Sequence, residues 1–172
     1  GKFNLSLAGI LPPFLTYLKL SFFFQNRLRS GDLPGRLRVL SINRSYPFPL
    51  EKGILPPYLE LLYYRVSKPF PLDGVLPSFL LQLELPPEYN FPFAKNTLPS
   101  SLKVLWTGDH FTAPLIYLPE GLEKLCVGVN YFHPFLHFPS GLRCLDLITE
   151  SQRSLLPHIL PEKLQVRVLI SV

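Results

Sequence analysis

The sequence predicts a mainly β solenoid, in which about eight short parallel strands form one sheet and are joined by helix-poor, proline-rich return loops. Three observations carry this prediction. A unit of about 22 residues recurs along the chain, and each unit has leucines at the spacing of a short strand. The chain also contains 20 prolines, spread so that few stretches between them could form a regular helix.

A leucine–proline pair opens each unit, with phenylalanine in place of leucine once. The pair recurs every 20 to 22 residues, and units 1 to 8 begin at Leu11, Leu33, Leu55, Leu76, Leu98, Leu118, Phe138 and Leu160. The leucines that follow give the pattern LPxxLxxLxL. The leucine at the eighth position is missing only from unit 8, whereas the tenth position is leucine in four units and isoleucine, tyrosine, threonine or valine in the others. Because side chains alternate across a strand, the last two leucines of the pattern point into the core and the residue between them points outward. The proline presets the turn before the strand.

The second half of the unit supplies further core residues. Thirteen positions after most starts lies an aromatic residue: Phe24, Tyr46, Tyr89, Phe111 and Tyr131. Lys68 interrupts this column, and we expect Phe70 to substitute for the missing ring. A glycine two residues before the next leucine–proline pair predicts a turn with positive φ at Gly9, Gly31, Gly53 and Gly74. The two 20-residue units lack this glycine, which predicts shorter return loops there.

The repeat organises the whole chain as one domain, residues 1–172. Residues 1–10 are predicted to be a partial first unit, and residues 148–172 an atypical C-terminal cap of the kind that closes a solenoid core. Within this cap, Leu164–Val172 alternates apolar and polar residues, as expected for a last strand.

Charge is distributed unevenly between the two halves of the chain. Residues 1–68 carry ten basic and three acidic side chains, whereas residues 69–172 carry seven basic and nine acidic ones. This asymmetry could steer an acidic partner to the N-terminal half, or it could be an ordinary solvated surface. The basic residues form no compact run, which argues against nucleic-acid binding, and no apolar run is long enough to span a membrane.

Few residues in this sequence could support catalysis or metal binding. His133 and His137 have the spacing of two metal ligands on a helix, but Pro134 opposes a helix there. Cys126 and Cys144 occupy different positions on adjacent predicted strands, which places their Cα atoms about 8 Å apart, too far for a disulfide. We therefore expect no enzyme activity, no metal and no cofactor.

Several segments resemble the FNIP repeat, a leucine-rich repeat variant. They include Phe111-Thr-Ala-Pro-Leu115, Leu98-Pro-Ser-Ser-Leu102-Lys-Val-Leu105 and Gly53-Ile-Leu-Pro56. The resemblance implies an origin in an amoeba or an amoeba-infecting giant virus, a role in protein–protein contact, and a location in the amoebal or host cytoplasm or in a virion. Some family members carry an F-box, but no such segment is visible here. The short unit Leu118-Pro-Glu-Gly-Leu122 also looks like the LPxxL units of secreted bacterial effectors.

The outward positions of the strands predict a binding surface, because repeat proteins commonly bind partners across such faces. The predicted partner-binding residues are Tyr17, Lys19, Leu61, Tyr63, Glu84, Val104, Trp106 and Asp146. Tyrosine and tryptophan are favoured anchors of protein interfaces. The sequence thus predicts a protein–protein interaction scaffold of unidentified partner; the alternative is a permanent structural subunit of a large assembly, such as a giant-virus capsid.

Overall fold

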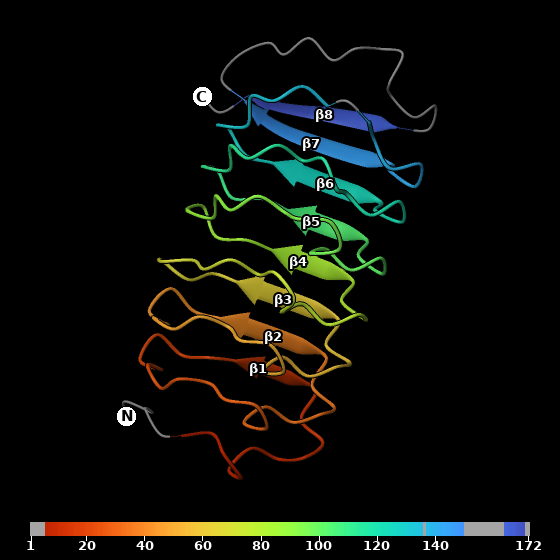
Figure 1. The fold of residues 1–172 in the computed structure, drawn as a ribbon. Helices are drawn as coiled ribbons and strands as arrows, with labels where there is room; N and C mark the ends of the chain where they lie inside the picture. The colour runs from red at the N-terminus through yellow and green to blue at the C-terminus, as the bar shows by residue number, and fades with distance from the viewer. Residues whose placement is uncertain (1–5, 136, 150–163, 171–172) are drawn as a thin grey trace.

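A computed structural model describes residues 6–135, 137–149 and 164–170. Each unit contributes one strand, and the eight strands form a single parallel sheet in chain order (Figure 1). The strands are β1 (Tyr17–Lys19), β2 (Val39–Ile42), β3 (Leu61–Tyr64), β4 (Gln82–Glu84), β5 (Val104–Trp106), β6 (Lys124–Val127), β7 (Cys144–Thr149) and β8 (Gln165–Ile170). No helix occurs in the described ranges, so the predicted solenoid is confirmed.

The register of the sheet follows the repeat. From β1 to β7 each residue pairs with the residue at the same position of the next unit, as in Leu40 with Leu62 and Leu105 with Leu125. Between β7 and β8 the register is shifted by one position, so that Leu145 pairs with Val166. Because the register is constant from unit 1 to unit 7, the core leucines of these units stack directly on one another. In units 2 to 7 the leucines at the fifth and eighth positions are at most 1% exposed, whereas Leu15 and Leu18 of unit 1 are only half-buried.

A β-turn precedes each of the strands β1 to β7, as the leucine–proline pair predicts. In units 1 to 7 the amide of the fifth residue of the unit donates to the carbonyl of the proline over 3.0 to 3.2 Å, from Leu15 and Pro12 to Leu142 and Pro139. The proline therefore supplies an acceptor to the turn and needs no donor of its own.

The aromatic residues of the return loops stack behind the sheet. Phe24 lies on Tyr46 with ring centroids 6.3 Å apart, and Phe111 lies between Tyr89 and Tyr131 at 6.5 and 6.3 Å. Tyrosine hydroxyls in this column also accept backbone amides of the preceding loop, from Leu28 to Tyr46 at 3.1 Å and from Leu115 to Tyr131 at 3.3 Å. Such bonds satisfy buried amides that no strand partner reaches.

The expectation that Phe70 replaces the ring missing at Lys68 is wrong. Phe70 is only half-buried, whereas Tyr64, the last residue of β3, is fully buried in the same unit. The Tyr64 hydroxyl accepts the Phe70 amide at 3.4 Å. A large buried residue at the end of the strand thus lies against the loop in which a lysine interrupts the aromatic column.

The predicted positive-φ turn forms at Gly9, Gly31, Gly53 and Gly74, with φ between 68° and 90°. Asn96 takes the same position of unit 4 with φ of 69°, and asparagine is one of the few non-glycine residues that tolerate this conformation. The proposed cap at 148–172 falls mostly outside the described residues, but β8 extends the sheet where a last strand was predicted.

Candidate partner-binding face

Two columns of side chains line the face of the sheet that points away from the aromatic stack. The first column pairs in register through Tyr17, Val39, Leu61, Gln82, Val104, Lys124 and Cys144. The second column contains Lys19, Ser41, Tyr63, Glu84, Trp106, Cys126 and Asp146. All eight residues predicted to bind a partner therefore lie on one face, spread over the strands from β1 to β7.

These residues differ in how far they are accessible. Tyr17 and Trp106 are 55% and 40% exposed, and Lys19 is exposed as well. The intervening Leu61, Tyr63 and Val104 are half-buried, so part of each side chain is accessible on the face. The sequence pattern does not predict these differences in exposure.

Glu84 is held by an arginine that is not among the predicted partner-binding residues. The Arg65 guanidinium makes two bonds to the Glu84 carboxylate, from Nε at 2.7 Å and from Nη2 at 3.1 Å, and lies 5.2 Å above the Tyr63 ring. The hydrogen bond to Glu84 raises the pKa of Arg65. The Glu84 carboxylate therefore bonds within this cluster and holds Arg65 over the Tyr63 ring.

Asp146 is the main departure from the predicted surface, because it is only 7% exposed. Lys124 Nζ lies 2.8 Å from one carboxylate oxygen, while the thiols of Cys126 and Cys144 donate to the carboxylate over 3.3 and 3.4 Å. The same Lys124 ammonium lies 5.5 Å from the Trp106 ring. Asp146 is thus surrounded by donors from its own and the neighbouring strand, and it orders the lysine beside Trp106 rather than facing a partner.

The donors around Asp146 decide its ionisation and that of the neighbouring thiol. Burial by itself would raise the pKa of Asp146, but the bonds from Lys124, Cys126 and Cys144 outweigh burial and lower it. Burial, the hydrogen bond to Asp146 and its negative charge raise the pKa of Cys126 to about 12. A thiol with so high a pKa is a poor nucleophile at neutral pH.

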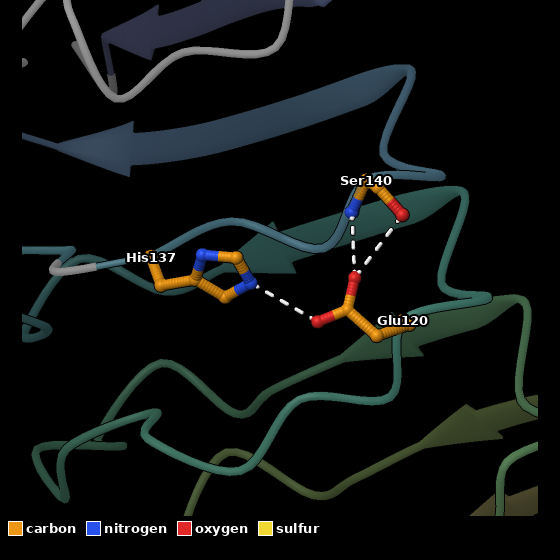
Figure 2. A network of polar contacts seen from close by, with 3 residues as sticks. All are labelled: Glu120, His137 and Ser140. Carbon is orange, nitrogen blue, oxygen red and sulfur yellow. Dashed lines mark hydrogen bonds and ion pairs between the residues drawn. The ribbon is translucent and has the colours of Figure 1, made fainter.

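A second polar cluster lies at the turn edge of units 6 and 7, where the sequence pattern indicates no site. Glu120 accepts the Ser140 amide at 3.0 Å and its hydroxyl at 3.1 Å through one oxygen, and bonds His137 Nε2 at 3.0 Å through the other (Figure 2). The Ser140 amide, followed by His137, lowers the pKa of Glu120. Because serine and histidine both bond the carboxylate, the histidine is not placed to take the serine proton. The cluster joins two units and does not have the arrangement of a nucleophile and its base.

Next to this cluster lies a hollow of about 210 Å³ on the return side, lined by Pro114, Leu115, Ile116, His133, Pro134 and His137. It falls in the two 20-residue units, which are one or two residues shorter than the other units. Within the described ranges, no group of three histidine, cysteine or acidic side chains is arranged to hold a metal ion. No helix of those ranges is long and apolar enough to cross a bilayer.

Comparison with known proteins gives a family match for part of the chain and a similar fold for nearly all of it. The FNIP Repeat model matches residues 70–110 and 89–130. None of the curated proteins matches the sequence. The crystal structure of CroV588, a giant-virus protein described as a novel circular LRR protein, superposes with a TM-score of 0.83 at 24% identity. The match covers 96% of this chain and 25% of CroV588, so the chain spans about a quarter of that protein's length. The repeats of residues 70–130 thus match the FNIP Repeat family, and the chain as a whole has the fold of a leucine-rich repeat protein.

Proposed function

We propose that this chain is a protein–protein interaction scaffold whose partner contacts the open face of the sheet. The observation that carries the proposal is the exposure of Tyr17 and Trp106 on a face where the core needs neither side chain. The leucines behind the sheet are already buried by the neighbouring units and the aromatic stack. Large aromatic residues left open on a flat face are favoured anchors for a protein partner.

Ordered charges beside the aromatic residues support this proposal. Lys124 is fixed over Trp106 by Asp146, and Arg65 is fixed over Tyr63 by Glu84. A side chain that is already held in one conformation loses less entropy when a partner binds. Both sites therefore offer an aromatic ring with a positioned cation.

The test compares the proteins that co-purify with the wild-type chain and with two variants, each identified by mass spectrometry. Trp106→Ala removes the open ring from the sheet face, whereas Phe132→Ala removes a ring of 67% exposure from a return loop and serves as the control. We expect a defined partner to be retained by Phe132→Ala and lost from Trp106→Ala, with unchanged thermal unfolding. Retention of every partner by Trp106→Ala would refute a role of this face.

A second candidate function is a permanent place in a larger assembly. The similarity of this chain to an arc of a circular protein favours it, since a closed ring leaves no open sheet edge. Sedimentation of the isolated chain tests this alternative. A stable complex of defined size that Trp106→Ala does not disturb would favour it over transient binding at the sheet face.

We further propose that the protein acts without catalysis and is located in the host or amoebal cytoplasm or in a virion. The raised pKa of Cys126 and the carboxylate-bound Ser140 support the absence of a nucleophile in these two clusters. Imaging of a tagged chain in infected and uninfected amoebae would test the location.

A further inference from the structure

The turn before each strand has two corner residues, and the second corner changes character along the chain. In units 1 to 4 it is large and in units 5 to 7 it is small: Phe14, Arg36, Tyr58 and Phe79, then Ser101, Gly121 and Gly141. The turn itself is the same throughout, because its closing hydrogen bond measures 3.0 to 3.2 Å in all seven units.

The units with small corners show that the turn folds without a large side chain at this position. Serine or glycine at the corner supports the turn and the buried leucine after it as well as an aromatic residue does. The three aromatic side chains are nevertheless 68%, 51% and 55% exposed at Phe14, Tyr58 and Phe79. Folding does not account for four successive large corners that are exposed to water, three of them aromatic.

The four large corners form a contiguous surface, which we name the corner stripe (Phe14, Arg36, Tyr58 and Phe79). The Arg36 guanidinium lies 4.8 Å from the Phe14 ring centroid, and the Tyr58 and Phe79 rings are 5.5 Å apart. Arg38, at the edge of the stripe, lies 5.7 Å from the Tyr58 ring. With strands about 4.8 Å apart, the stripe extends roughly 14 Å across four units, the length of four or five residues of extended peptide.

Charge indicates what such a peptide would carry. Arg38 is neutralised by Glu60 at 2.7 Å, whereas Arg36 has no carboxylate partner among the residues that the structure describes. The surrounding sequence is strongly basic, with ten basic and three acidic side chains in residues 1–68. A single-stranded nucleic acid would need a track of cations along its backbone, and the stripe itself supplies one free arginine.

We propose that the corner stripe binds an extended segment of a partner protein in which apolar or aromatic side chains flank a carboxylate. The carboxylate pairs with Arg36, and the apolar side chains pack on Phe14 and on the Tyr58–Phe79 pair. This surface lies at the turns before the strands and is separate from the sheet face around Trp106, so it goes beyond the function proposed above.

The test measures fluorescence anisotropy with labelled probes. Three peptides have the same length and spacing: one combines glutamate with phenylalanine, the second has lysine in place of glutamate, and the third has serine in place of phenylalanine. A labelled oligouridylate is the nucleic-acid probe. We expect the glutamate–phenylalanine peptide to bind the wild-type chain and the other three probes to bind at least tenfold more weakly. A tenfold difference in affinity is roughly the contribution of one well-placed charge or ring contact.

The variants follow the natural variation of the corner. Tyr58→Ser combined with Phe79→Ser reproduces the corner of unit 5, and Arg36→Glu reverses the free charge; each should weaken peptide binding about tenfold. Arg143→Glu makes the same charge change at an exposed site of unit 7 and should leave peptide binding unchanged. Trp106→Ala, a separate variant outside the stripe, should also leave peptide binding unchanged.

Four results would overturn the proposal: no binding of the acidic peptide, equal binding of the lysine peptide, binding of oligouridylate that the stripe variants abolish, or a lowered unfolding temperature in the serine variant, which would make the corners structural. Because Trp106 is not part of the stripe, failure of the sheet-face proposal leaves this test unaffected.

Discussion

Gly108 is expected to be the glycine in the described part of the chain that is least tolerant of a side chain. A Cβ added there would lie 1.9 Å from the carbonyl oxygen of Pro86 and 2.7 Å from the Cα of Pro87, both backbone atoms of the preceding unit. An ordinary carbon–oxygen contact is about 3.3 Å, so Gly108→Ala requires the two turns to separate by roughly 1.4 Å.

The free-energy cost of separating the two turns depends on the contacts between them. The His110 amide donates to the Pro87 carbonyl at 2.9 Å, and a displacement of about 1.4 Å would take this bond beyond hydrogen-bond range. Phe111 follows directly and would move away from Tyr89 on which it stacks. One lost backbone hydrogen bond and disturbed packing of the buried Phe111 together predict a loss of about 3 kcal/mol in the free energy of unfolding.

Thermal and urea unfolding followed by circular dichroism measure this loss. For a domain of this size, about 3 kcal/mol corresponds to a decrease of roughly 6 to 12 °C in Tm. Gly35→Ala is the control, because a Cβ at Gly35 meets no atom within 4 Å and its φ is not positive. An unfolding temperature of Gly108→Ala within about 2 °C of the control would refute the reasoning, since the turns would then have to separate at no cost.

Two further predictions concern ionisation. Burial raises the pKa of Tyr64 to about 12 from its ordinary value of 10.0, so the unfolded chain releases this proton first and stability falls as pH rises from about 10 to about 12. The loss is at most about 3 kcal/mol, and a series of urea titrations should show it reduced in Tyr64→Phe; an unchanged alkaline loss would contradict the assignment. Asp146→Asn removes the carboxylate that helps to raise the pKa of Cys126, so its thiol should react faster with a disulfide reagent at pH 8 or so, whereas a slower reaction would contradict the arrangement of the cluster.

The repeat allowed much of the fold to be predicted because it is a local pattern. A leucine three residues after another, followed by one two residues later, specifies a short strand with one buried face, and its recurrence specifies a parallel stack. The proline and glycine positions specify turns through the φ angles that they permit. The outward columns followed from alternation alone, and all eight predicted contact residues share the sheet face.

Contacts between units could not be predicted in the same way, because they depend on side chains about 20 residues apart that lie side by side only after stacking. Tyr64 is the large buried side chain beside the loop in which Lys68 interrupts the aromatic column, although it occupies a different position of the repeat unit. Asp146 has an outward position but is covered by three donors.

The sequence by itself thus determined the solenoid, the sheet and the face on which a partner is expected, since each depends on backbone periodicity. The tertiary structure decided which outward residues are accessible. It left Trp106 open and enclosed Asp146, and it placed the corners of units 1 to 4 in one stripe. The physical reason is that periodicity fixes the direction in which a side chain points, whereas accessibility depends on the size and charge of the neighbours that stacking brings beside it.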